Sequence, residues 1–148
     1  MTLIGPKTEC TILIVEDDPD IRDALRDVLE LDGYEIVEAS NGKEGLERLR
    51  NIVRPCVILL DLMMPVMSGR EFIAVLRETD VLATIPVVVV SAWPDEAAHV
   101  RERTQGFVRK PVMLDALLSL VERFCTAPPP RGAVLRSLEL VPNARNEQ

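Results

Sequence analysis

The chain has 148 residues, 47% of them hydrophobic, so it can form one domain with a sizeable core but is too short for two full domains. Its 17 basic and 24 acidic residues give a net charge of −7, and this sign disfavours direct binding to nucleic acid. No apolar run approaches the roughly 18–20 residues that a membrane span needs, and we expect no membrane insertion.

The scarcity of histidine and cysteine narrows the chemistry further. His99 is the only histidine, which excludes a multi-histidine metal site. The three cysteines, Cys10, Cys56 and Cys125, are odd in number and lie far apart in apolar stretches, which favours reduced core thiols over a disulfide framework. The first ten residues lack a basic segment followed by an apolar one, so no secretory signal is expected. These features predict a cytoplasmic protein.

Short apolar runs alternate with amphipathic stretches along residues 10–125. The first run, residues 11–15 (TILIV), precedes a helix pattern from Pro19 to Leu31, with Asp18 as its N-cap and Gly33 past its end. The remaining expected elements, in chain order, are a strand at Tyr34–Ala39, a helix at 42–51, a strand at Val57–Leu60, a helix at 70–79, a strand at 87–90, a helix at 95–103, a strand at 107–108 and a helix at 114–124.

Five strands alternating with five helices predict an α/β fold with a parallel sheet. Three of the strands are apolar without alternation, as expected of strands that helices cover on both faces. The strand at Tyr34–Ala39 is more mixed, and we expect it at an edge of the sheet.

The two ends of the chain lie outside this pattern. Residues 1–9 are expected to form an N-terminal extension to a domain at residues 10–125. Three consecutive prolines at 128–130 cannot continue a helix, so residues 126–148 are expected to form a Pro-rich tail or linker that is disordered by default.

Polar residues stand where the predicted strands end. They are Glu16, Asp17 and Asp18 after the first strand, Asp61 after the third, Ser91 after the fourth and Lys110 after the fifth. Because the carboxyl ends of parallel strands share one edge, where open α/β folds bind ligands, these groups can converge. Clustered carboxylates with few other protein ligands suit Mg²⁺, which keeps several waters. Beside such a cation, Asp61 could attack phosphorus while Lys110 and Ser91 take up phosphoryl oxygens.

Simpler roles exist for several of these residues. Asp61 could cap a helix, but the next helix is expected near Gly69, eight residues on, which is too far for a cap contact. Asp18 precedes Pro19, and N-cap preference favours helix capping over metal ligation for this residue. Taken alone, Ser91 would be interpreted as a turn hydroxyl and Lys110 as a solvated charge. They indicate a functional site only together with the other polar residues at the strand ends.

Together these residues resemble the receiver domain of two-component response regulators. The motifs, in order along about residues 10–125, are Glu16-Asp17, residues 61–69 (DLMMPVMSG), Ser91-Ala92 and Lys110-Pro111. The resemblance implies a flavodoxin-like fold with a five-stranded parallel sheet in order 2-1-3-4-5. It also implies that a sensor histidine kinase or phosphotransfer protein donates a phosphoryl group from phosphohistidine to Asp61. Phosphorylation then switches binding to a downstream protein, and the domain is not an enzyme beyond its own phosphorylation and dephosphorylation.

The resemblance also assigns the metal ligands and the switch. Asp17 and Asp61 would ligate Mg²⁺ directly, the backbone carbonyl of Met63 would be a third ligand, and Glu16 would act through water. Ser91 would move toward the phosphoryl group and Lys110 would pair with it. The residue that matches the family's switch aromatic, which repacks inward when the hydroxyl moves, is Phe107. The Lys110–Pro111 peptide bond is expected to be cis, as in the family.

Two features depart from the family's pattern. Ser91 and Lys110 are 19 residues apart, which is short for the family, and the Ala-Leu-x-x-Gly-Ala pattern before the fifth strand is missing. We therefore expect a truncated or reoriented fourth helix. No output-domain signature follows Phe124, so the chain is expected to be a stand-alone receiver or a piece of a longer protein.

Other functions on the same fold require different residues. A phosphatase of the haloacid dehalogenase type would need a second Asp where Met63 stands, and a nucleotide or flavin binder would need a glycine-rich loop where residues 16–19 are acidic. The alternative that stays open is a receiver-like interaction module that no longer switches by phosphorylation.

Overall fold

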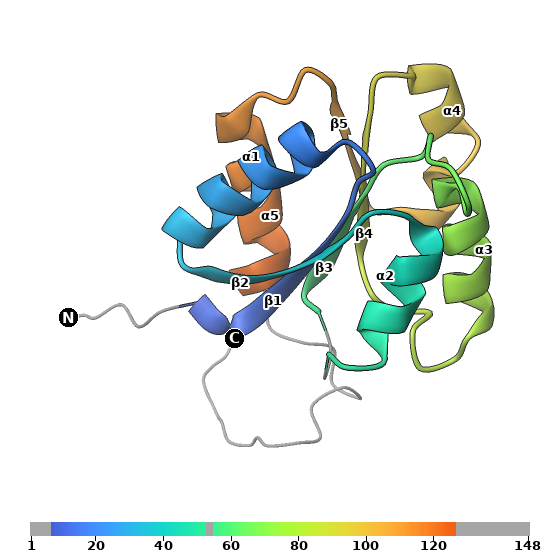
Figure 1. The fold of residues 1–148 in the computed structure, drawn as a ribbon, viewed down its shortest axis with the longest axis horizontal. Helices are drawn as coiled ribbons and strands as arrows, with labels where there is room; N and C mark the ends of the chain where they lie inside the picture. The colour runs from blue at the N-terminus through green and yellow to red at the C-terminus, as the bar shows by residue number, and fades with distance from the viewer. Residues whose placement is uncertain (1–6, 53–54, 127–148) are drawn as a thin grey trace.

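The computed structural model describes residues 7–52 and 55–126 (Figure 1). The predicted extension at residues 1–9 and the predicted tail at residues 126–148 therefore lie outside the described residues, apart from residues 7–9 and 126.

Strands and helices alternate along the described residues as the sequence predicts, although several boundaries differ. The elements are β1 (Lys7–Val15), α1 (Pro19–Leu31), β2 (Tyr34–Ala39), α2 (Gly42–Leu49), β3 (Val57–Leu60), α3 (Gly69–Glu78), β4 (Val87–Ser91), α4 (Pro94–Ala98), the 3₁₀ helix η1 (Arg101–Arg103), β5 (Gly106–Arg109) and α5 (Leu114–Thr126).

The sheet is parallel throughout, with strand order β2-β1-β3-β4-β5. This confirms the predicted order and the edge position of β2. The chain leaves β1 toward β2 on one side and returns to β3 on the other side, so the order reverses between β1 and β3. Open α/β sheets bind ligands at the carboxyl ends of the strands beside such a reversal.

Helices cover both faces of this sheet, with α1 and α5 on one face and α2, α3 and α4 on the other (Figure 1). Successive strand side chains point to opposite faces, so Ile12 and Ile14 pack in the core beneath α1 and α5, whereas Leu13 and Val15 pack beneath α2 and α3. Both faces are buried, which explains the uninterrupted apolar runs in β3 and β4.

The start of α1 confirms the predicted N-cap. A carboxylate oxygen of Asp18 accepts hydrogen bonds from the backbone amides of Asp20 (2.9 Å) and Ile21 (3.4 Å). Pro19 occupies the first turn, where a missing amide hydrogen costs nothing. Past the helix, Gly33 has a φ of 98°, a left-handed conformation that glycine adopts without steric cost and that lets the chain turn into β2.

The fourth helix is shorter than the pattern predicts. A continuous helix over residues 95–103 is wrong: α4 ends at Ala98 and a separate 3₁₀ turn, η1, follows it. Between the two, Val100 is buried in the core, and the Thr104 hydroxyl donates to its carbonyl at 3.1 Å. The truncation expected from the short Ser91–Lys110 spacing is confirmed.

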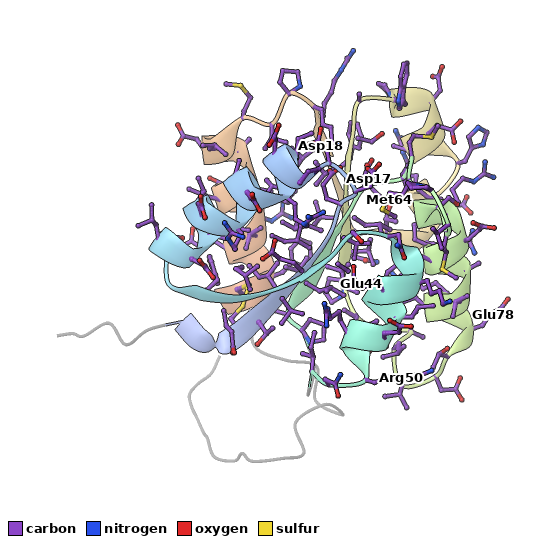
Figure 2. All side chains as sticks on the ribbon, in the orientation of Figure 1. Asp17, Asp18, Glu44, Arg50, Met64 and Glu78 are labelled. Atoms are coloured by element: carbon purple, nitrogen blue, oxygen red, sulfur yellow. A yellow bond between two sulfur atoms is a disulfide. The ribbon has the colours of Figure 1, made fainter. Side chains whose placement is uncertain are left out.

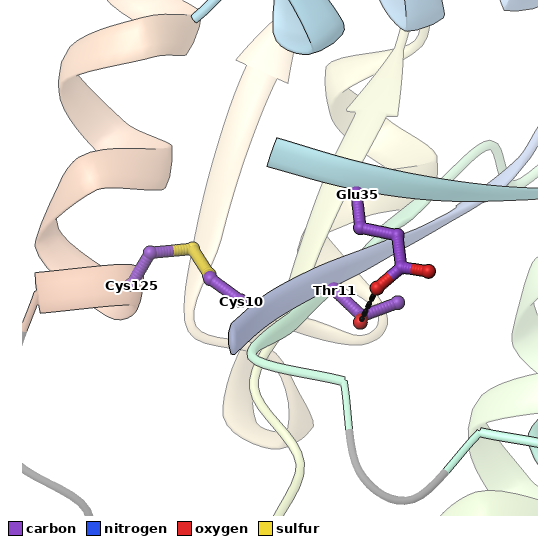
Figure 3. The surroundings of a disulfide bond; sticks show 4 residues. All are labelled: Cys10, Thr11, Glu35 and Cys125. Atoms are coloured by element: carbon purple, nitrogen blue, oxygen red, sulfur yellow. Dashed lines mark hydrogen bonds between the residues drawn. A yellow bond between two sulfur atoms is a disulfide. The ribbon is translucent and has the colours of Figure 1, made fainter. Parts of the chain in front are cut away.

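The cysteine prediction needs correction as well. Cys10, in β1, and Cys125, in the last turn of α5, form a disulfide with their Cα atoms 5.9 Å apart (Figure 3). The two are 115 residues apart in sequence, and only the packing of α5 against the sheet brings them together. Cys56 is outside the disulfide. The argument from reduced thiols for a cytoplasmic location is therefore lost for this pair.

Among the described helices, none combines the length and the apolar character that crossing a bilayer requires.

Candidate functional site

Three acidic side chains meet at the carboxyl end of the sheet. Glu16 and Asp17 directly follow β1, and Asp61 directly follows β3. These two strands are neighbours at the reversal, and one carboxylate oxygen from each residue lies within 4.8 Å of the others. Figure 2 shows Asp17 and Asp18 where β1 leads into α1. The structure thus brings together Glu16, Asp17 and Asp61, as their positions at the ends of parallel strands predict.

Lys110 directly follows β5, at the edge of the sheet, and its side chain reaches this cluster. Its Nζ lies 2.9 Å from Oε1 of Glu16 and 3.5 Å from Oδ2 of Asp61. Its backbone amide donates to the carbonyl of Ser91 at 3.0 Å, which joins the ends of β4 and β5. The Lys110–Pro111 bond is cis, as expected. One ammonium group therefore contacts two of the three carboxylates, those of Glu16 and Asp61.

Burial sets the proton affinities of the cluster. Glu16 and Asp61 are 2% and 6% exposed. Burial raises the pKa of Glu16 to about 7; Lys110 opposes this shift and the charge of Asp61 adds to it. Burial likewise raises the pKa of Asp61, again with Lys110 opposing. Burial alone would lower the pKa of Lys110, but its contacts with Glu16 and Asp61 raise it. The cluster holds more negative charge than Lys110 neutralises.

The donor set fits a hard divalent cation. Oε1 of Glu16 is buried, and its partner is the Lys110 ammonium at 2.9 Å. The three clustered groups offer only oxygen atoms, which Mg²⁺ prefers. Asp18 has a different role, because its carboxylate caps α1. The amide of Met63 donates to Oδ1 of Asp61 at 3.3 Å, so the Met63 backbone borders the same carboxylate.

The loop that follows Asp61 is held tightly against it. The amide of Gly69 donates to the carbonyl of Leu62 at 2.9 Å, and a Cβ at position 69 would lie 2.5 Å from the carbonyl oxygen of Asp61. Ser68 and Glu71 form a reciprocal capping box at the start of α3. The sequence analysis missed this support, although Ser and Glu three residues apart before an apolar stretch are its signature.

A second supporting residue missed from the sequence is Arg22. Its Nη1 donates to the backbone carbonyl of Glu16 at 2.7 Å, and its Nε lies 3.4 Å from Oε1 of Glu38. The side chain thereby anchors the backbone of a cluster residue. The available signal was its place one turn after the N-cap Asp18.

Ser91 and Phe107 lie on the neighbouring strands β4 and β5. Ser91 is fully buried, and its Oγ accepts a hydrogen bond from the amide of Trp93 at 3.0 Å. Phe107 is 40% exposed and stands opposite Val89 in the strand register. A cavity of about 330 Å³ adjoins the ring, and its lining includes Val89, Ala97 and Phe107 itself. The ring thus has space beside it, between α4 and the sheet.

Comparison with known families gives a direct match. Residues 12–122 match the response regulator receiver domain. The chain is 32% identical over 117 residues to the polar-differentiation response regulator DivK of Brucella anthropi, which covers 77% of this chain and 94% of DivK. It is 42% identical over 103 residues to the sensor histidine kinase TmoS of Ectopseudomonas mendocina, which covers 68% of this chain but only 10% of TmoS.

Solved structures agree with these relatives. The chemotaxis protein CheY4 of Vibrio cholerae superposes with a TM-score of 0.71 at 28% sequence identity, covering 78% of this chain and 98% of CheY4. The fold is accordingly flavodoxin-like, as the motifs imply.

Proposed function

Because this chain belongs to the response regulator receiver domain family of two-component signalling, we propose that Asp61 accepts a phosphoryl group from the phosphohistidine of a sensor histidine kinase or phosphotransfer protein. The observation that carries the proposal is the position of Asp61. It follows the central strand β3, borders two further carboxylates and has the ammonium of Lys110 at 3.5 Å.

In the proposed transfer, a carboxylate oxygen of Asp61 attacks phosphorus. The P–N bond of the donor breaks, and the departing imidazole nitrogen keeps the electron pair. Lys110 turns from Glu16 and Asp61 to the phosphoryl oxygens and offsets their charge. The low exposure of Asp61 limits the access of water to the acyl phosphate.

We assign Asp17, Asp61 and the Met63 carbonyl as direct ligands of Mg²⁺, with Glu16 acting through water. When bound, Mg²⁺ would supply positive charge for the phosphoryl oxygens. The convergence of three carboxylate oxygens, from Glu16, Asp17 and Asp61, supports a cation at this place.

The switch belongs to Ser91 and Phe107 in this proposal. Ser91 leaves the Trp93 amide and donates its hydroxyl hydrogen to a phosphoryl oxygen. The Phe107 ring then moves from the surface toward the cavity beside α4, and the altered face binds or releases a downstream protein. We expect this to take place in the cytoplasm, where kinases have access to ATP.

The test is intact-mass spectrometry after incubation with acetyl phosphate. We expect one phosphoryl addition in the unmodified chain with Mg²⁺ and none after chelation. Asp61→Asn should stay unmodified, whereas the exposed Asp95→Asn should be modified like the unmodified chain. Addition to Asp61→Asn at the same rate would refute Asp61 as the acceptor.

The shortened α4 favours one second candidate, a receiver-like interaction module that does not switch by phosphorylation. No phosphoryl addition in any condition, with the fold intact by circular dichroism, would support that module instead.

A further inference from the structure

The three cysteines converge at the end of the sheet opposite the acid cluster. Cys10 lies near the start of β1, Cys56 directly precedes β3, and Cys125 is in the last turn of α5. Their three sulfur atoms all lie within 4.8 Å of one another. Figure 3 shows the bond that joins Cys10 to Cys125. A third cysteine sulfur is thus in close reach of a formed disulfide.

We propose that this cluster is a thiol–disulfide exchange site, in which Cys56 attacks the Cys10–Cys125 bridge and moves it to Cys10–Cys56. The Cys56 thiolate attacks Sγ of Cys10, the S–S bond to Cys125 breaks, and Cys125 leaves as a thiolate that takes up a proton. One disulfide is lost and one is formed, so the step needs no external oxidant or reductant.

The secondary structure favours this direction of exchange. The amide of Cys56 donates to the carbonyl of Thr11 at 2.8 Å, and the next residue pair, Ile12 and Val57, is in register between β1 and β3. Cys10, in β1, and Cys56, directly before β3, are therefore joined through neighbouring paired strands, and their sulfur atoms already lie within 4.8 Å of each other. Cys125 belongs to the terminal turn of a helix, where fraying has a low free-energy cost, and is the better leaving partner.

The partial burial of the three cysteines shields the Cys10–Cys125 disulfide from bulk solvent and still allows Cys56 to exchange with it. Cys10 is buried, whereas Cys56 and Cys125 are half-buried. All three pack with the core side chains beneath α1 and α5. Metal binding is the less favoured use of the cluster, because two of its three sulfur atoms are bonded to each other and only Cys56 keeps a thiol.

The consequence concerns the end of α5. With the Cys10–Cys125 bridge, the last turn is tied covalently to β1. With the Cys10–Cys56 bridge, α5 is held by its earlier core residues, Leu117 and Val121, and its last turn is free to open. Exchange would thus set how firmly the C-terminal end of the domain is fastened.

The sequence makes the bridges easy to map. After trypsin, Cys10, Cys56 and Cys125 fall in three separate peptides, residues 8–22, 51–70 and 124–131. The full chain, purified without reductant, is held at low pH or at about pH 8.5, where a typical thiol is half ionised. It is then alkylated and digested, and linked peptides are identified by mass spectrometry.

We expect two species that interconvert at the higher pH. In one, peptide 8–22 is linked to 124–131 and the label is on Cys56; in the other, 8–22 is linked to 51–70 and the label is on Cys125. The second should accumulate with time at the higher pH. A chain that shows only the first species after prolonged incubation, or no bridge at all, would overturn the proposal.

Variants isolate the two states. Cys56→Ser should hold only the Cys10–Cys125 bridge at every pH. Cys125→Ser, or Cys125→Ala if the serine variant folds poorly, should form Cys10–Cys56 with oxidised glutathione. Amide hydrogen exchange over residues 121–126 should then be several-fold faster in the oxidised Cys125 variant than in Cys56→Ser. A folded Cys125 variant that keeps both thiols alkylatable would contradict the exchange.

Discussion

Val66 combines an unfavourable backbone conformation with a place in the loop between Asp61 and Gly69. Among the described residues it is the one non-glycine with a positive φ, at 69°. β-Branched side chains rarely adopt this region, because Cβ crowds the backbone. The side chain is 75% exposed, so packing offsets little of the cost. The loop from Asp61 to Gly69 thus holds a locally unfavourable residue.

Replacing Val66 by glycine should therefore stabilise the domain. Removing the left-handed penalty gains roughly 1–2 kcal/mol, and the larger entropy of glycine in the unfolded chain returns about 0.4–1 kcal/mol of it. The net expectation is a rise of about 1 kcal/mol in the free energy of unfolding, measured by urea denaturation. Val66→Ala, which keeps a Cβ, is the control and should gain less. A loss of stability in the glycine variant would show that the Val66 side chain contributes more than its backbone costs.

At the scale of an element, α2 begins with a set of paired hydrogen bonds. Asn41 Oδ1 accepts from the amide of Glu44 at 2.9 Å, and Oε1 of Glu44 accepts from the Ser40 amide at 2.6 Å and the Ser40 hydroxyl at 2.8 Å. These two bonds from Ser40, with Arg48 adding, lower the pKa of Glu44 below its ordinary value.

This shift gives a pH dependence of definite sign. A carboxyl with a lowered folded-state pKa stabilises the fold above its unfolded pKa, and this contribution is lost as the pH falls through the folded value. Glu44→Gln should reduce stability near neutral pH by about 0.5 kcal/mol, a small figure because the side chain is partly exposed. The difference should shrink below about pH 4. Urea melts of both chains across this range test it, with the exposed Glu47→Gln on the same helix as control; a difference independent of pH would exclude the charge as its cause.

Arg77 joins the segments around the shortened α4. From α3, its guanidinium donates to the carbonyls of Ala83 (2.8 Å), Ile85 (3.0 Å) and Arg103 (2.6 Å from Nη2), and to Oε1 of Gln105 (3.1 Å). It thus fastens the approach to β4 and the end of η1 to α3. Simultaneous hydrogen bonds to these acceptors require the several N–H donors of a planar guanidinium group, which lysine lacks.

Arg77→Ala should lower the free energy of unfolding by about 2–3 kcal/mol, because partly buried carbonyls lose charged donors. Arg77→Lys should recover only a small part. The control is Arg70→Ala, whose 3.8 Å ion pair with Glu96 is exposed and worth at most about 0.5 kcal/mol. Equal stability of the lysine and arginine chains in urea denaturation would mean that charge alone, not the planar guanidinium group, matters.

For the molecule as a whole, the local pattern of apolar runs and helix caps was enough to predict the strands of the parallel sheet. β2 and β3 have the predicted bounds, and α1 begins and ends where its cap and glycine indicate. The break after Ala98 was not predictable in detail, because it depends on the burial of Val100 and on Arg77 contacts from 26 residues away. The disulfide was missed for the same reason, since its partners are 115 residues apart.

The candidate site divides in the same way. The convergence of Glu16, Asp17 and Asp61 follows from the ends of parallel strands, so sequence order sufficed to predict it. The contact of Lys110 with Glu16 at 2.9 Å did not follow, because it depends on the side-chain geometry of the assembled edge. The close packing of Gly69 against Asp61 was likewise visible only in the folded loop, and for Arg22 the sequence offered only its place one turn after Asp18.

The two ends of the sheet differ in how they are held, and this leads to the last prediction. The end with the cysteines is fastened covalently, whereas the opposite end carries three carboxylates against one ammonium. Repulsion among these carboxylates opposes folding, and a bound divalent cation would relieve it. Mg²⁺ should therefore raise the melting temperature. At ten times its Kd the gain is about 1.4 kcal/mol, or roughly 4 °C for a domain of this size.

Neighbouring aspartates distinguish this effect from general screening. Asp17→Asn removes a proposed ligand and should abolish the Mg²⁺-dependent shift, while raising stability in its absence by lowering the repulsion. Asp18→Asn keeps the cap of α1, because asparagine caps as well as aspartate, and should respond to Mg²⁺ like the unmodified chain. Thermal melts in MgCl₂ and in NaCl of equal ionic strength measure both. An unchanged response in Asp17→Asn would place the cation elsewhere, because a cation bound at this edge would lose one of its carboxylate ligands.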